Sequence, residues 1–480
     1  MGSLPRPSPR FSFFYCFAFF LLIAAFLAAG IAAIDNSCLD AADGAYLISG
    51  NAVAHGLFPY RDFLAAHPPA IYLLGGLLAR LGKGVAPFRI FSLLLSAGLG
   101  LAVWRLALRI TGKRAEALLA GTLAMFAPLG VYFSKLYLND SMVALLTAAT
   151  FFLLLGGSRR QTAAAGALSV TGMLTKLTYF PVLAAAVVFV LVWRRAQLRL
   201  FLGVAFIGVA VTALLLEAFT SGAYLADIIG AQASKGASFA NFYEGMHRIW
   251  QMDWPLLVPA AGGLWFSISD LAGKKKDTAG HREGQALVLL WLAAGLASLA
   301  TLPAEGHDTN LFQVAEPAIA ILAATGLGRL ARGRIALGPA VAVALMAVMF
   351  PAIAVKDRSF LTRSNASVTA AIVAEIDSAA RPGDQVLAPG CPALEAGRPV
   401  ADNFFDQFLW EEKFKRGDSD ATKLFLGIAG EIGSGRLPAV AFQQGQPSQS
   451  IFLNQLQRHY YPVRFPDKVT PPLTLWLLKK

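Results

Sequence analysis

Charged residues are scarce in this sequence. Asp, Glu, Lys and Arg make up 15% of the 480 residues, against 56% hydrophobic residues, and the mean hydropathy is +0.56. Soluble domains carry about 25% charged residues, and a soluble core cannot absorb this much apolar surface. Hydrophobic runs of the roughly 20 residues needed to cross a bilayer recur between Phe11 and Pro351. The composition excludes an ordinary soluble protein and predicts a membrane protein of many helices.

Familiar nucleotide- and metal-binding patterns are also missing. The sequence has no Walker or Rossmann glycine loop, no zinc-ligand spacing and no internal repeat. Nucleotide-driven transport therefore has no support. We predict no cofactor, and the sequence leaves a divalent metal open.

The sequence has three cysteines, Cys16, Cys38 and Cys391, too few for a disulfide framework. Cys16 falls in the first hydrophobic run, whereas the other two fall in segments expected outside the membrane, where oxidation is possible. A bridge between Cys38 and Cys391 is conceivable. Because residues so far apart need not meet, we expect unpaired thiols instead.

Positive charge gives the chain a net charge of +12, but it is gathered in short clusters between apolar runs. We therefore expect no nucleic-acid partner. Under the positive-inside rule these clusters are cytoplasmic, and the acidic segments between them lie outside. The clusters are Arg6 and Arg10, Arg105 to Arg114, Arg159 and Arg160, Arg194 to Arg199, Lys274 to Arg282, and Arg329 to Arg334.

The alternation predicts an all-α polytopic fold of about eleven spans over residues 1–355, with the N-terminus inside and the C-terminus outside. After Lys356 the composition becomes mixed, and residues 356–480 are predicted to form a small extracytoplasmic α/β domain with short apolar runs such as Gln385 to Ala388, Ala439 to Phe442 and Leu473 to Leu478. The expected spans start near Phe11, Pro87, Ala115, Ser141, Thr162, Pro181, Arg199, Pro255, Ala286, Gln313 and Ile335.

Two outer segments carry interface signals. Pro69 to Leu81 is apolar but too short to span, so we place it as a helix at the outer interface, within a first outer loop of residues 35–86. The segment from Thr220 to Trp254 contains aromatic residues that are typical of interface anchors.

The first outer loop is dense in polar side chains. Carboxylates, imidazoles and a guanidinium occur in order: Asp40, Asp43, Tyr46, His55, Tyr60, Arg61, Asp62 and His67. Charged groups at the bilayer edge cost free energy unless they are solvated or paired, so this density suggests a site. A merely solvated loop, with Arg61 and Asp62 paired, is the alternative.

The order Asp, Tyr-Leu, Gly-x-x-Pro-Tyr-Arg-Asp-Phe, His-Pro-Pro and Tyr-Leu-Leu resembles the first outer loop of the GT-C superfamily of glycosyltransferases. It is most similar to the group of dolichyl-phosphate-mannose protein mannosyltransferases, aminoarabinose transferases and lipopolysaccharide galacturonosyltransferases. Weaker likenesses follow at Phe88 to Ser92, Tyr137 to Asp140, Gly172 to Lys176 and Gly306 to Glu316.

The resemblance implies a GT-C-like fold and inverting transfer of a sugar from a polyprenyl-phosphate donor to an acceptor hydroxyl of a glycan, lipid or protein. It makes Asp43 the catalytic base. Relatives commonly carry Glu at the next position, where this chain has Gly44, so a second acid would have to come from Asp40 or Asp140. His67 stands where the aminoarabinose transferases have Lys.

Chemistry gives the same assignments a physical basis. Inverting transfer needs a carboxylate to take the acceptor proton, and cations to stabilise the leaving phosphate. We predict that Arg61, His67, Lys176 and Arg89 bind the donor phosphate, although Lys176 could instead reach outward to lipid headgroups. Tyr60, Asp62, His307, Asn310 and Glu316 are further candidate site residues.

Two other classes of function stay open. A polytopic transporter or flippase of lipids or sugars would show charges near mid-membrane and repeat symmetry, and a non-catalytic assembly protein would tolerate Gly44. We expect a multi-pass protein of a bacterial inner membrane, with its active site and C-terminus outside the cytoplasm.

Overall fold

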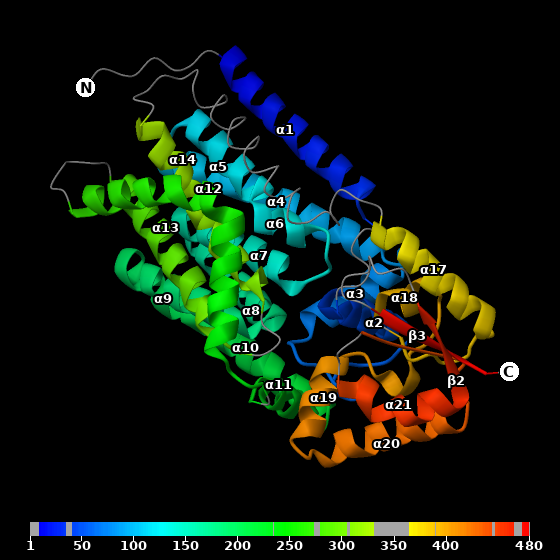
Figure 1. The fold of residues 1–480 in the computed structure, drawn as a ribbon. Coiled ribbons are helices and arrows are strands. Elements are labelled where there is room, and N and C mark those ends of the chain that lie inside the picture. The colour runs from blue at the N-terminus through cyan, green and yellow to red at the C-terminus, as the bar shows by residue number, and fades with distance from the viewer. Residues whose placement is uncertain are drawn as a thin grey trace, which may run out of the picture.

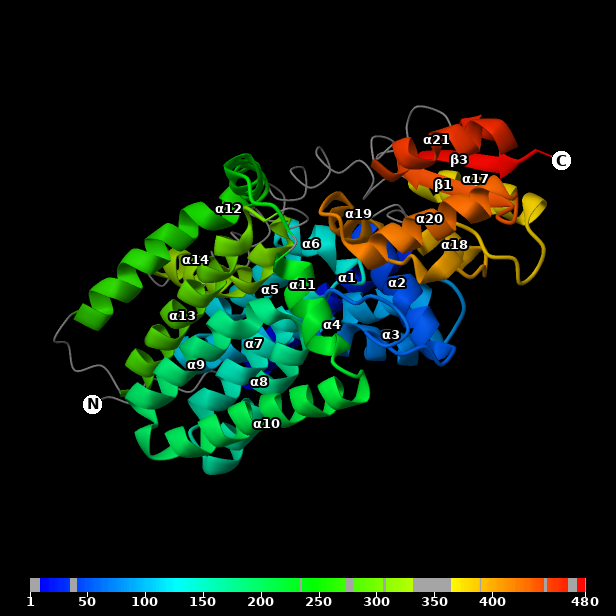
Figure 2. The same ribbon diagram turned by 90° about the horizontal axis from the view of Figure 1, so that it is seen from below.

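The computed structural model describes residues 9–34, 41–233, 235–272, 279–304, 308–330, 364–388, 390–443, 447–464 and 473–479. Within these ranges the chain is a bundle of helices with a small α/β unit at one end, formed by residues 364–479 (Figure 1). The turned view shows the same unit beside α2 and α3 (Figure 2). These arrangements agree with the predicted helical fold.

The bundle is built from apolar helices in chain order. They are α1 (Pro9–Ala32), α2 (Ala41–Ala54), α3 (Ala70–Ala79), α4 (Ala86–Thr111), α5 (Arg114–Phe126), α6 (Pro128–Ser134), α7 (Asn139–Gly156), α8 (Arg159–Thr175), α9 (Phe180–Trp193), α10 (Leu198–Phe219), α11 (Ala223–Ala233), α12 (Phe239–Ala272), α13 (Ala279–Ser298) and α14 (Glu316–Leu330). Short 3-10 turns lie at Leu177–Tyr179, Arg195–Gln197, Leu299–Thr301 and Thr309–Val314.

Six described helices are long and apolar enough to cross a bilayer, or seven if the bent pair α5 and α6 counts as one span. Helices also lie near the expected starts Thr162, Pro181 and Gln313, but α8, α9 and α14 are shorter than the other spans. The eleventh expected span, from Ile335, lies outside the described residues. The chain is thus a multi-pass membrane protein, while the count of eleven stays a prediction.

One local expectation agrees with the structure and one is refined. The short apolar stretch after Pro69 forms the ten-residue helix α3, as predicted. The span expected near Pro255 begins much earlier, at Phe239, and α12 continues through Pro255 and Pro259. Several aromatic residues expected in a loop are therefore helical.

The C-terminal unit, residues 364–479, contains a three-stranded antiparallel sheet in the order β1, β3, β2. Its strands are β1 (Ala439–Gln443), β2 (Tyr460–Arg464) and β3 (Leu473–Leu478), and its helices are α17 (Ser364–Ala379), α18 (Gly390–Glu395), α19 (Gln407–Lys415), α20 (Ser419–Gly433) and α21 (Pro447–His459), with a 3-10 turn at Ala401–Asn403. Central β3 pairs Trp476 with Val440 and Pro462. The predicted runs at Ala439 and Leu473 are thus strands.

The cysteines correct one expectation. Cys391 is disulfide-bonded, whereas Cys16 is free. The prediction of unpaired thiols is therefore wrong for Cys391, which is buried in α18. Cys38 lies outside the described residues.

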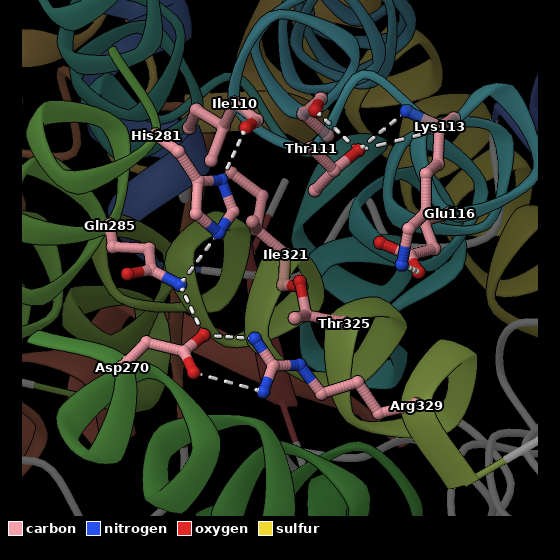
Figure 3. Close-up of polar contacts among 11 residues, drawn as sticks. Ile110, Thr111, Lys113, Glu116, Asp270, His281, Gln285, Ile321, Thr325 and Arg329 are labelled. Carbon is pink, nitrogen blue, oxygen red and sulfur yellow. Dashed lines mark hydrogen bonds and ion pairs between the residues drawn. The ribbon is translucent and has the colours of Figure 1, made fainter. Parts of the chain in front are cut away.

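A polar network connects α4, α12, α13 and α14 at one end of the bundle (Figure 3). Gln285 of α13 donates to Oδ2 of Asp270 over 2.9 Å, Arg329 of α14 pairs with the same carboxylate, and His281 Nδ1 lies 3.0 Å from the carbonyl of Ile110 in α4. Arg89 lies near the other end of α4. At 1.5 Å per residue the two ends are about 30 Å apart, close to the thickness of the hydrocarbon core.

Candidate active site

Asp43 and Arg89 form a fully buried ion pair between α2 and α4. Asp43 lies in the first turn of α2, where the helix dipole favours an anion, and Nη2 of Arg89 donates to Oδ2 of Asp43. Both side chains are 0% exposed. The backbone N–H of Tyr137 donates to the other carboxylate oxygen over 2.6 Å. Both oxygens of Asp43 thus accept hydrogen bonds, which fixes the orientation of the carboxylate.

Arg89 is held from a second direction. Its Nη1 donates to the carbonyl of Ile34 over 2.6 Å, so the guanidinium joins the end of α1 to the start of α2. Breaking one partner of a buried pair commonly costs about 3–5 kcal/mol. The pair therefore also stabilises the fold around the site.

Asp140 and Lys176 form a second buried ion pair. Nζ of Lys176 donates to Oδ1 of Asp140 over 2.7 Å and to Oδ2 over 2.9 Å. Asn310 adds a bond from Nδ2 to Oδ2 over 2.8 Å. Lys176 lies at the end of α8 and Asp140 in the first turn of α7. The ammonium points into the bundle toward Asp140 instead of outward to lipid headgroups.

The segment between α6 and α7 joins these two pairs. Tyr137 binds Asp43, and Asp140 follows three residues later and binds Lys176. The same segment contains Lys135, whose side chain is 0% exposed and lies 5.7 Å from the ring of Tyr132. The sequence prediction missed Lys135, although a lysine in an apolar stretch five residues before Asp140 could have indicated a buried charge near the site.

Arg61 and Asp62 form an exposed pair. The Nη2 to Oδ2 distance is 2.7 Å, with side chains 46% and 25% exposed, and Asp62 also accepts from the N–H of Phe58 over 2.7 Å. The guanidinium lies 5.4 Å from the ring of Phe219 at the end of α10. The side-chain bond from Arg61 lowers the pKa of Asp62.

Tyr60 and His67 are brought together by a strained turn. Tyr60 has a φ of 70°, a left-handed conformation that non-glycine residues adopt at a cost. Its hydroxyl donates to the carbonyl of His67 over 2.6 Å, and the His67 ring lies 5.6 Å from the ring of Tyr46, one turn after Asp43. Burial raises the pKa of Tyr60 well above its ordinary value.

Glu316 lies apart from both ion pairs. It accepts from the N–H of Gly130 over 3.1 Å, beside Asp253, which accepts from Leu129 over 3.4 Å. Both carboxyl groups thus meet the start of α6, while the Asp43 pair meets the segment after its end. Asp40 and His307 lie outside the described residues.

Lys235 and Asp406 are functional candidates that the sequence prediction missed. Burial lowers the pKa of Lys235 to about 8; Asp406 opposes this shift and Lys176 adds to it. Lys235 is therefore electrostatically coupled to both the ion-pair lysine and the C-terminal unit. Nothing in the local sequence marked either residue, because their electrostatic interaction depends on packing between distant segments.

Three hydrogen bonds connect the turn that contains Lys235 to other parts of the chain. Gln232 donates to the carbonyl of Ala66 over 3.4 Å, Arg416 donates to that of Ala233 over 3.3 Å, and Ser238 donates to that of Pro303 over 2.9 Å. The first outer loop, the C-terminal unit and the loop before Asn310 thus meet here. Among the described residues no group of three or more His, Cys, Asp or Glu side chains could hold a metal ion.

The comparisons identify the class of fold. Residues 66–219, about a third of the chain, match the family model described as dolichyl-phosphate-mannose-protein mannosyltransferase. The chain has the fold of the GT-C membrane glycosyltransferases, and the resemblance seen in the sequence is confirmed. No curated protein matches by sequence.

Particular solved structures share this fold at low identity. ArnT from Cupriavidus metallidurans, in a crystal structure bound to undecaprenyl phosphate, is 15% identical with a TM-score of 0.66, and the match covers 95% of this chain and 97% of ArnT. Its apo structure gives a TM-score of 0.65 at 15% identity and the same coverage. The oligosaccharyltransferase of Archaeoglobus fulgidus is 11% identical with a TM-score of 0.54, covering 92% of this chain and 73% of that one.

Proposed function

We propose that this protein is a membrane glycosyltransferase that moves a sugar from a polyprenyl-phosphate donor to an acceptor hydroxyl, with inversion, at the outer face of the membrane. The proposal rests on one observation: two buried ion pairs, Asp43–Arg89 and Asp140–Lys176, lie next to the same backbone segment between α6 and α7. The GT-C fold supports it. The undecaprenyl phosphate bound to ArnT makes a polyprenyl phosphate the natural donor class for this chain.

Lys176 is suited to hold the donor phosphate. An ammonium has three N–H donors, and two of those on Lys176 are directed at the oxygens of Asp140. The third can bind a phosphate oxygen by a charge-assisted bond. We also assign to the phosphate Lys235, whose turn is bonded to Ala66 of the first outer loop through Gln232, and the imidazole of His67 as a further hydrogen-bond donor.

Asp43 is suited to take the acceptor proton. In the reaction the bond from the anomeric carbon to the phosphate oxygen breaks, the bond to the acceptor oxygen forms, and the acceptor proton moves to a carboxylate. Arg89 and the backbone N–H of Tyr137 each donate to one oxygen of Asp43, and together they fix the orientation of the carboxylate. Lys176 donates to both oxygens of Asp140, so we assign Asp140 the role of orienting Lys176.

The direct test is sugar transfer in proteoliposomes that contain only the purified protein. A panel of radiolabelled polyprenyl-phosphate sugars and hydroxyl acceptors should give a labelled product and release polyprenyl phosphate. Movement of the intact donor across the bilayer without cleavage would establish a flippase instead. No transfer and no movement would favour a non-catalytic assembly protein.

A further inference from the structure

The C-terminal unit contacts the helix that carries Asp43 through two glycines. A Cβ placed on Gly44 would lie 3.3 Å from the backbone nitrogen of Gly390 and 3.4 Å from that of Cys391. A Cβ placed on Gly390 would overlap the carbonyl group of Gly44. Backbone thus packs directly on backbone between α18 and α2, tightly at Gly44 and without space for any side chain at Gly390.

The other end of α18 contacts the helix that carries Arg89. Oε1 of Glu395 accepts from the N–H of Val85 over 2.9 Å. Val85 precedes α4, and its carbonyl accepts from the N–H of Arg89 over 3.2 Å. Glu395 therefore fixes the first turn of α4, from which the Arg89 side chain extends.

The six residues of α18 thus bridge the starts of the two helices whose side chains form the buried ion pair. Figures 1 and 2 both show α18 next to α2. We infer that α18 positions the Asp43–Arg89 pair, with Gly390 and Glu395 as positioning residues, so that the C-terminal unit is a working part of the active site. The inference rests on the proposed function and deepens it. It also gives a physical reason for glycine at position 44, because a side chain there would press on the backbone of Gly390 and Cys391.

The inference predicts a loss of turnover without loss of donor binding. Gly390→Ala should push α18 away from α2 and displace Asp43. A displacement of about 1 Å at a reacting group can cost about 100-fold in rate. We expect kcat to fall at least tenfold, and the donor Kd to change less than threefold because the Asp140–Lys176 pair is untouched. Gly430→Ala is the matched control, since a Cβ there meets nothing within 4 Å.

Glu395 gives a second test that does not add bulk. Glu395→Gln keeps an oxygen that can accept from Val85 and should retain most activity. Glu395→Met has similar length but no strong acceptor, and it should lower kcat. The thermal midpoint of each variant, measured in detergent, separates a positioning role from a purely structural one. A purely structural contact would lower the midpoint but leave kcat unchanged at a temperature where the protein stays folded.

The outcomes separate this inference from the proposed function. If the wild-type protein transfers no sugar, the proposed function fails. If the wild type is active and a folded Gly390→Ala protein keeps normal kcat, or Glu395→Met equals Glu395→Gln, α18 does not position the ion pair.

Discussion

Tyr137 donates its backbone N–H to Oδ1 of Asp43 over 2.6 Å, and this bond links the two ion pairs of the site. Asp140 lies three residues further along the same segment, at the start of α7, and holds Lys176. One short stretch of backbone thus contributes a contact to each of the two pairs.

Asp43→Asn should lower turnover by about a hundredfold or more while donor binding persists, because the amide keeps the shape of the carboxylate but cannot accept a proton. Single-turnover transfer and donor binding measured on the same preparation give both quantities. Asp420→Asn, on a side chain that is 77% exposed, is the control. A dead Asp140→Asn beside an active Asp43→Asn would move the base to Asp140.

Lys176→Gln should weaken donor binding or turnover by roughly ten- to a hundredfold, the range expected for a lost charge-assisted hydrogen bond of about 1.5–3 kcal/mol. Asp140 would be left without its ammonium, so a double variant with Asp140→Asn should be better folded than the single one. Lys423→Gln, 77% exposed, is the control. Normal donor affinity in Lys176→Gln would leave the lysine a purely structural role.

If Lys235 binds the donor phosphate, donor binding should depend on pH. Its pKa is lowered to about 8, chiefly by burial, so the ammonium is lost as pH rises from 7 to 9. A phosphodiester keeps one negative charge over this range, so donor affinity should fall. Lys235→Arg keeps its charge throughout and should show a flatter profile. Equal profiles for the two proteins would contradict a role for Lys235 in phosphate binding.

Replacing Asp227 by asparagine should stabilise the protein. Burial raises its pKa to about 6, against opposing effects of the Ala65 N–H and Lys413. An acid whose pKa is raised on folding costs stability when ionised, and the cost disappears as pH falls through the raised pKa. Asp227→Asn can still accept from Ala65, and it should gain about 1 kcal/mol at pH 8, discounted for partial exposure. The gain should shrink toward pH 5; a gain independent of pH would point to another cause.

The predicted topology can be tested with two side chains of similar exposure. Glu244 is 62% exposed in the segment expected outside, and Lys113 is 61% exposed in a cluster expected inside. In intact cells a cysteine at Glu244 should react with a membrane-impermeant thiol reagent, and one at Lys113 should react only after permeabilisation. The reverse pattern would invert the whole orientation.

The sequence predicted what depends on local pattern. The ordered motif of the first outer loop marked Asp43, and the apolar run after Pro69 marked α3. The likeness of the Tyr137 to Asp140 and Gly172 to Lys176 segments singled out Asp140 and Lys176, which the fold brings into contact. Asn310 donates to Asp140, whereas Glu316, which follows the 3-10 turn Thr309–Val314, accepts from Gly130.

Contacts between distant segments could not be predicted in this way. Gly44 was noted only as a missing acid, since nothing in its neighbourhood indicates that Gly390 packs on it. Lys235 and Asp406 have ordinary neighbours, and their interaction arises from a junction of three segments. The partner of Arg89 was also hidden, because an arginine at the start of a span is compatible with lipid headgroups until the fold buries it.

The contact between Glu395 and Val85 joins residues 310 positions apart, and this separation bears on how the protein matures. During synthesis α2 and α4 are made long before α18, so on the inference above the site is completed only after most of the chain has been made. A contact of such long range forms late in folding. A chain that ends before α18 would then have Lys176, the proposed donor-binding residue, but lack the contacts that we infer position Asp43, and we expect it to show little turnover.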